Sequence, residues 1–248
     1  MAHPSGGYKD AEGRKLPGVT TVCGRFKESG GLIGWAYKTG REHENLANRG
    51  LPAPSRLHER VEEAADIGTT GHAMVEAYIN GEDPHAVLDK ALSLVPDDRK
   101  DSYKKSAESS YKAYRSWERM TNLEIVAQEI SLVSTEYRFG GTPDAVGIID
   151  GEYCLVDWKT SNGVYTDMLI QLAAYKHLVE RGFLFEGGKA TDKQLGYELT
   201  GGFHLCRFAK EHGDFAHHYY PDLSEAWEQF KRFREAYETD KILKKRAS

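Results

Sequence analysis

The sequence predicts an α/β core with a helical N-terminal region that packs on it or covers it. Two observations support this fold class. Apolar residues recur with helical spacing up to about residue 120, and the pattern changes to that of strands from residue 123. The strands expected between residues 138 and 160 are apolar on both faces, which is typical of a sheet covered by helices on both sides.

The N-terminal half is expected to be mainly helical. Residues 1–18 are rich in glycine and polar groups and predict a flexible lead-in. Two short helices broken at Gly30-Gly31 come next, and Ser55 is placed to cap a further helix. A long charged helix is expected over residues 97–120, and its aromatic face is interpreted as core packing.

The C-terminal half alternates between strands and helices. Strands are expected over residues 123–133, 138–149, 152–160, 195–208 and 214–220. Helices are expected over residues 165–182 and from the capping residue Asp222 to the basic end of the chain. We therefore expect one domain over residues 19–248, with a mainly helical part (19–121) and an α/β part (122–248).

Composition excludes several classes of protein. The N-terminus lacks the apolar segment of a secretory signal, and no apolar run is long enough to span a membrane. The three cysteines are far apart, which argues against a zinc site, an iron–sulfur cluster or a disulfide framework. These features favour a cytoplasmic protein with no membrane partner. The net charge of −5 does not indicate nucleic-acid binding, but residues 231–248 hold seven Lys/Arg against three Asp/Glu.

A hairpin in the α/β part brings two acids together. Asp150-Gly151 is a strong signal for a two-residue turn between apolar strands. If Ile149 pairs with Glu152, Asp144 lies directly opposite Asp157, with Cβ atoms about 4.5–5.5 Å apart. Two carboxylates this close repel each other unless a cation neutralises them, and hard divalent cations prefer carboxylate oxygens.

Further candidate groups surround this pair of acids. Lys159 is two residues beyond Asp157 and therefore lies on the same face of the strand, where it can orient or deprotonate water and counter phosphate charge. The backbone carbonyl of Trp158 is a candidate third oxygen ligand. Gln171 and Tyr175 are four residues apart on the expected helix, so they share a face and can position Lys159 or a phosphate. This chemistry suits metal-assisted hydrolysis of a phosphodiester.

The motif set resembles the PD-(D/E)xK nuclease superfamily, and most closely its RecB-like exonuclease branch, which includes the mitochondrial genome-maintenance exonuclease and phage exonucleases. The resemblance runs from about residue 16 to residue 180. Its motifs are His72, Glu129, Gly141-Thr142-Pro143-Asp144, Asp157-Trp158-Lys159-Thr160 and Gln171-x-x-x-Tyr175.

The resemblance implies a restriction-endonuclease-like fold, with a mixed central sheet flanked by helices. It also implies Mg²⁺ or Mn²⁺ held by His72, Asp144 and Asp157, with Lys159 as the catalytic lysine and Gln171 and Tyr175 as a further motif. Glu129 either reaches a metal through water or is an ordinary strand residue. Some relatives carry four cysteines for an iron–sulfur cluster, which this chain lacks.

The function expected from the resemblance is a metal-dependent DNA exonuclease, acting on single strands or ends in DNA repair, recombination or phage DNA processing. The setting would be a bacterial or phage-infected cell. Two alternatives remain: a structure-selective endonuclease and a non-catalytic DNA-binding subunit. The need for a recombination or replication partner protein is left open.

Candidate DNA contacts lie in two places on the chain. The N-terminal helices are expected to contribute Trp35, Lys38 and Arg41, with core and solvated positions as the alternative interpretation. Thr160 and Ser161 directly follow the catalytic lysine.

Overall fold

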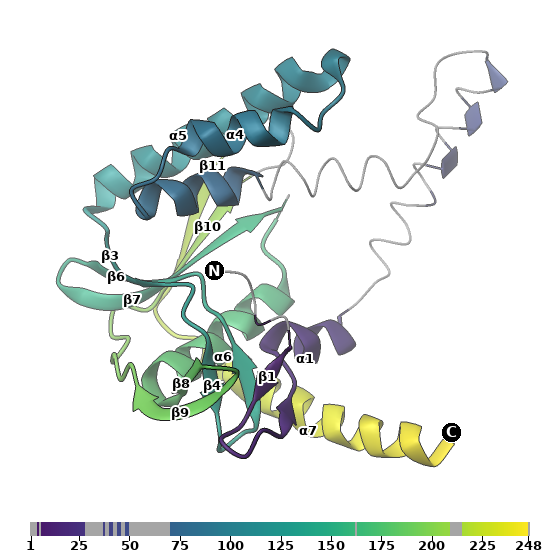
Figure 1. Ribbon diagram of the computed structural model, residues 1–248, viewed down its shortest axis with the longest axis vertical. Helices are drawn as coiled ribbons and strands as arrows, with labels where there is room; N and C mark the ends of the chain where they lie inside the picture. The colour runs from purple at the N-terminus through teal and green to yellow at the C-terminus, as the bar shows by residue number, and fades with distance from the viewer. Residues whose placement is uncertain are drawn as a thin grey trace. The chain divides into compact units, whose positions relative to one another are not determined.

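Figure 1 shows the computed structural model of the chain. The structure describes residues 4, 6–27, 37, 40, 41, 44, 45, 48, 49, 70–161, 163–208 and 215–247. The chain forms two compact units. The first comprises Met1–Phe26, Arg115–Arg207 and Ala216–Ser248, and the second comprises Lys27–Tyr114 with Phe208–Phe215. A single domain over residues 19–248 stays a prediction.

The first unit is built on a five-stranded sheet with the strand order β11-β10-β7-β6-β3 (Figure 1). Backbone hydrogen bonds from Leu155 N to Gly202 O and from Gly201 N to Tyr153 O join β7 to β10. Residue numbers rise together along these two strands, so they run parallel, whereas β6 pairs antiparallel with both β3 and β7. The sheet is therefore mixed, as expected. Its strands are β3 (Glu124–Gln128), β6 (Ala145–Ile149), β7 (Glu152–Thr160), β10 (Phe203–Phe208) and β11 (Phe215–Tyr220).

A second, four-stranded sheet has the order β5-β4-β8-β9. All its neighbouring strands are antiparallel. The hairpin of β8 and β9 turns at Gly187-Gly188, where both residues have positive φ, a conformation that glycine adopts readily. The strands are β4 (Leu132–Ser134), β5 (Phe139–Gly141), β8 (Phe183–Glu186) and β9 (Lys189–Gln194).

Two strands that were expected to be continuous are each divided between the two sheets. The strand predicted over residues 123–133 breaks at Glu129, whose φ of 47° is incompatible with extended backbone. The strand predicted over residues 138–149 breaks at Pro143, which has no N–H group to donate to a ladder. Asp144 therefore lies where the chain passes from β5 of one sheet to β6 of the other.

The expected strand over residues 195–208 was wrong in its first half. Only Phe203–Phe208 are extended as β10, and β8 and β9 were not predicted. The strand β8 has only four residues, and β9 carries Lys189, Asp192 and Lys193 rather than the alternating apolar pattern of a typical strand.

Residues 8–16, which were expected to lie in a flexible lead-in, form a hairpin of β1 (Tyr8–Lys9) and β2 (Lys15–Leu16). Tyr8 is buried, and its ring lies so close to Gly140 that a Cβ atom there would collide with it. The Tyr8 hydroxyl is 2.8 Å from Thr142 Oγ1, which is in turn 2.8 Å from Ser131 Oγ. The hairpin is thus tied to the loop that leads into Asp144.

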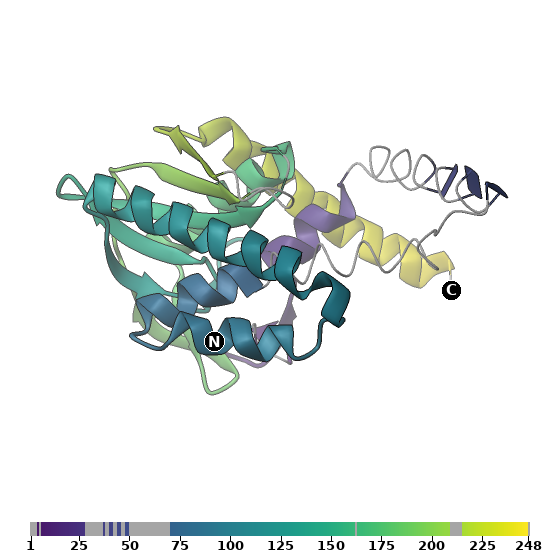
Figure 2. The same ribbon diagram turned by 90° about the horizontal axis from the view of Figure 1, so that it is seen from above.

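Three helices of the first unit share its main hydrophobic core. They are α1 (Val19–Arg25), α6 (Thr166–Arg181) and α7 (Ser224–Ala247), and they contact one another. Figure 2 shows α7 as one long helix with α1 beside it. The core also takes in Val146, Leu155, Phe203 and Leu205 from the five-stranded sheet, so α6 covers the face of the sheet that these residues form. The helix expected over residues 165–182 is confirmed.

The helix predicted from Asp222 begins at Ser224, and Asp222 accepts hydrogen bonds from Ser224 N and Ser224 Oγ at 3.1 and 2.6 Å. This contact satisfies a backbone donor at the start of α7.

The second unit contains a helix over residues 70–79, α4 (Pro84–Leu92) and η1 (Asp97–Arg99). The long helix α5 (Lys100–Thr121) starts in this unit, and Met74, Leu88 and Ala107 form a small core within it. The burial of Tyr103 and Tyr114 confirms that the aromatic face of α5 is core packing. The predicted break at Gly30-Gly31 and the cap at Ser55 lie outside the described residues. No described helix combines the length and apolar character that crossing a membrane requires.

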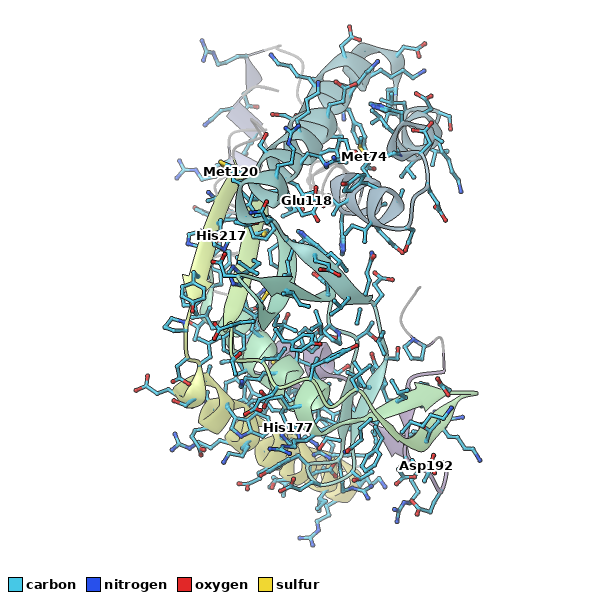
Figure 3. The ribbon with its side chains drawn as sticks, turned by 90° about the vertical axis from the view of Figure 1, so that its left-hand side faces the viewer. Met74, Glu118, Met120, His177, Asp192 and His217 are labelled. Atoms are coloured by element: carbon cyan, nitrogen blue, oxygen red, sulfur yellow. The ribbon has the colours of Figure 1, made fainter. Side chains whose placement is uncertain are left out.

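A pair of stacked histidines lies on the face of the five-stranded sheet opposite α6. His204 Nδ1 and His217 Nε2 are 2.9 Å apart, and the ring of Trp117 from the last turns of α5 lies 5.1 Å from that of His217. Figure 3 shows His217 beside this end of α5, where Glu118 and Met120 lie. Because His204 Nε2 donates to Gly201 O, its Nδ1 accepts from His217. Burial, with His204 and His218 adding to it, lowers the pKa of His217 to about 4.

We predict that this pair makes the fold sensitive to acid. A histidine whose pKa is lowered on folding stabilises the fold above its unfolded pKa of about 6.5, and this contribution is lost as the pH falls toward 4. His217→Gln keeps a donor for His204 but removes the titrating ring. The urea midpoint, followed by circular dichroism, should therefore fall less between pH 7 and pH 4.5 in His217→Gln than in the wild type. The exposed His85→Gln serves as the control, and equal acid sensitivity of all three proteins would contradict the prediction.

Candidate active site

The register of the β6–β7 hairpin is as the sequence predicts. Ile149 pairs with Glu152 and Ala145 pairs with Val156, so the next position along brings Asp144 opposite Asp157. The turn residues Asp150 and Gly151 have φ of 53° and 83°, as a turn with two left-handed residues requires. Asp144 precedes the first residue of β6, and one of its carboxylate oxygens accepts a hydrogen bond of 2.9 Å from Trp158 N.

Asp157 and Lys159 form an ion pair at this end of β7. Lys159 Nζ lies 2.8 Å from Oδ1 and 2.7 Å from Oδ2 of Asp157, so the ammonium contacts both oxygens. The Asp157 side chain is only 1% exposed, whereas that of Lys159 is 23% exposed. A buried carboxylate is costly without a cation. The lysine neutralises this acid and still reaches the surface.

Burial and the two acids together set the pKa values of Lys159 and Tyr175. Burial works to lower the pKa of Lys159, but attraction to Asp157 and Asp144 outweighs it and raises the pKa. Asp167, in the first turn of α6, adds to this effect. Burial, together with repulsion from Asp144 and Asp157, raises the pKa of Tyr175 well above its usual value, so its hydroxyl stays protonated.

Gln171 and Tyr175 lie one turn apart on α6, the helix that packs against β7. Tyr175 is buried and Gln171 is partly exposed. A Cβ atom on Gly141 would come within 2.8 Å of the Tyr175 ring, which shows how closely the glycine lets the helix approach the motif loop. The structure therefore brings Tyr175 close to the acids, while a role for Gln171 stays a prediction.

The donors at this site fit a hard divalent cation. Among the described residues there is no group of three or more His, Cys, Asp or Glu side chains suited to a metal. Mg²⁺, however, is commonly held by one or two carboxylates, with water and phosphate oxygens completing its shell. The Asp144 and Asp157 carboxylates and the Trp158 carbonyl match that preference. Glu129 is close by, since its backbone N–H donates to Asp144 O at 2.9 Å.

The remaining predicted residues lie further along the chain or in the second unit. Thr160 ends β7, and Ser161 is buried with its hydroxyl donating to Gly163 O. His72 is half-buried in the helix over residues 70–79 of the second unit, one turn before Glu76. Arg41 is exposed, and Trp35 and Lys38 lie outside the described residues. The assigned roles of these residues stay predictions.

Two charged residues of this region were not identified from the sequence. Asp167 is detectable as the acid in the first turn of a helix that follows the motif. Arg207, on β10, donates from Nη1 to Ser161 O at 3.0 Å. No sequence signal predicts that contact, because it depends on β10 being the neighbour of β7.

The fold and the site together match a nuclease scaffold: a mixed sheet flanked by helices, with two acids and a lysine at the end of a hairpin. The sequence model of the PD-(D/E)XK nuclease superfamily matches residues 37–243, and the chain belongs to this superfamily. Nucleases of the superfamily generally use divalent metals such as Mg²⁺ or Mn²⁺.

More distant comparisons add little to this assignment. No protein among the curated sequences matches the chain. The crystal structure of SSO0001 is similar at 15% identity and a TM-score of 0.30, covering 69% of this chain and 72% of its own. The structure of LHK-Exo in complex with dAMP is similar at 15% identity and a TM-score of 0.33. The similarity covers 74% of this chain and 95% of the LHK-Exo chain.

We predict that Lys159→Ala folds but is less stable than the wild type. The variant leaves the buried Asp157 carboxylate without its cation, which should lower the free energy of unfolding by about 3–5 kcal/mol. Urea unfolding in EDTA measures this loss, with the exposed Lys193→Ala as the control. Millimolar Mg²⁺ or Mn²⁺ should restore part of the stability, because a ligand that binds only the folded state stabilises it. Unchanged stability in EDTA would disprove the pairing.

Proposed function

We propose that the protein is a divalent-metal-dependent deoxyribonuclease that degrades DNA from an end, with single-stranded DNA as the favoured substrate. The observation that carries the proposal is the convergence of Asp144, Asp157 and Lys159 at one end of the β6–β7 hairpin. Membership of the nuclease superfamily supports the hydrolysis of phosphodiester bonds.

Each group at the site has a distinct part in this proposal. Asp144, Asp157 and the Trp158 carbonyl would hold Mg²⁺ or Mn²⁺. When bound, the cation supplies the positive charge that activates water and offsets the charge developing on the phosphate. Lys159 is held beside Asp157, where its ammonium orients the attacking water and stabilises the charged transition state. The protonated Tyr175 hydroxyl is a hydrogen-bond donor near both acids.

The proposal is tested with end-labelled linear single-stranded DNA and a closed single-stranded circle. Each substrate is incubated with Mn²⁺, Mg²⁺ or EDTA. The wild type is compared with Asp157→Ala, Lys159→Ala and the control Asp192→Ala, which replaces an exposed acid on β9. We expect metal-dependent loss of the linear strand only, with wild-type activity in Asp192→Ala and none in the two site variants.

Other outcomes would replace the proposal. Cutting of the circle would identify an endonuclease. Binding without cleavage under every condition would identify a non-catalytic DNA-binding protein. Full activity in Asp157→Ala would remove the assigned site.

We further propose that His72 is a metal ligand, as the resemblance to RecB-like nucleases implies. His72→Ala should then need a higher Mn²⁺ concentration for half-maximal activity, and Mn²⁺ should raise its melting temperature less than that of the wild type. His85→Ala, from the same unit, is the matched control. Superimposable Mn²⁺ titrations of the wild type and His72→Ala would exclude the histidine from the site.

A further inference from the structure

Arg207 lies on the strand next to the two acids and the lysine. The hydrogen bond from Leu155 N to Gly202 O sets the register of the parallel strands β7 and β10. Lys159 lies four residues after Leu155 on β7. Counting four residues from Gly202 along the parallel strand β10 places residues 206–207 beside Lys159. The hydrogen bond of 3.0 Å between Arg207 Nη1 and Ser161 O confirms that this end of β10 lies beside the end of β7.

The Arg207 side chain is on the same face of the sheet as the acids. Phe203 and Leu205 share the hydrophobic core with Leu155, and Leu155 is two residues before Asp157. Alternate residues of a strand point to the same face. Arg207 therefore follows Phe203 and Leu205 on the face that carries Asp157 and Lys159.

The charge of Arg207 is not neutralised by any acid in the described parts of the chain. No described carboxylate forms an ion pair with it, and its one side-chain hydrogen bond is to the neutral Ser161 carbonyl. By contrast, the ammonium of Lys159 contacts both oxygens of Asp157. A guanidinium has five N–H donors, so Arg207 keeps most of its donors for a ligand while Ser161 fixes its direction.

An anion is a suitable ligand for this partly exposed guanidinium, whose positive charge no described acid pairs with. Two carboxylates repel the phosphates of an incoming strand, and Lys159 is engaged with one of them. A second cation on the same face offsets this repulsion, and the planar fork of arginine matches two oxygens of a phosphate.

We propose that Arg207 binds a phosphate of the substrate strand beside the bond that is cleaved. This assignment rests on the proposed nuclease function and adds a substrate-binding residue to it. Ser161 is the positioning residue, because its backbone carbonyl orients the guanidinium.

The test separates the charge of Arg207 from its contact with Ser161. Arg207→Gln keeps an N–H donor for the Ser161 carbonyl but loses the charge, and Arg207→Lys keeps the charge but loses the fork. Arg232→Gln, at an exposed position of α7, is the matched control. Melting curves of all variants establish that they are folded.

Cleavage and binding are then measured separately. For Arg207→Gln we expect kcat/KM on linear single-stranded DNA to fall about ten- to hundredfold. Added guanidinium should restore part of this activity, and the loss in Arg207→Lys should be smaller. Binding of a fluorescent oligonucleotide in EDTA should lose about 0.7 from its log–log salt slope, the value for one phosphate contact on a single strand. Arg232→Gln should match the wild type in both measurements.

Wild-type kcat/KM and salt slope in Arg207→Gln would overturn the assignment and leave Arg207 as a structural contact to the Ser161 loop. If Arg207→Gln does not fold, Arg207→Lys provides the test. Loss of the planar fork should lower the kcat/KM of Arg207→Lys, so a wild-type kcat/KM in that variant would overturn the assignment. If the wild-type protein cleaves no substrate, the proposed function fails, but the salt slope measured in EDTA still tests the phosphate contact by itself.

Discussion

A two-residue turn sets the positions of Asp144, Asp157 and Lys159 relative to one another. Because Asp150 and Gly151 both adopt positive φ, the strands on either side pair with Ile149 opposite Glu152. A shift of one residue would turn Asp157 and Lys159 to the other face of the sheet and bury the wrong side chains against α6. The apolar contacts of Val146 and Leu155 in the core hold the same register, so packing and chemistry depend on one alignment.

The site also holds charged side chains where they are buried away from water. Asp157 is almost fully buried, and its pairing with Lys159 makes this tolerable. Asp157 and Asp144 raise the pKa of the lysine, whereas burial, together with repulsion from the same two acids, keeps the Tyr175 hydroxyl protonated. The charges at the end of β7 are therefore in place before a substrate binds. Electrostatic catalysis requires this kind of preorganisation.

Local patterns in the sequence predicted the local structure well. The hairpin, its register, β7 and α6 follow from turn chemistry and periodicity over short distances. The division of the strands at Glu129 and Pro143 was missed, because apolar residues continue on both sides of each break. The contact of Arg207 with Ser161 was also missed, since it depends on the order of strands distant in sequence. The chemistry expected of Asp144, Asp157 and Lys159 follows from the hairpin register, whereas that of His72 and Glu129 comes from the resemblance.

The contact between the Tyr8 and Thr142 hydroxyls joins residues 134 positions apart. On the ribosome, the Tyr8 hydroxyl therefore cannot make this contact until Thr142 has been made. Contacts of such long range form late in folding, because the intervening loop must close first. The loop before Asp144 thus gains this support only after the long segment between Tyr8 and Thr142 has been ordered, which delays assembly of the site.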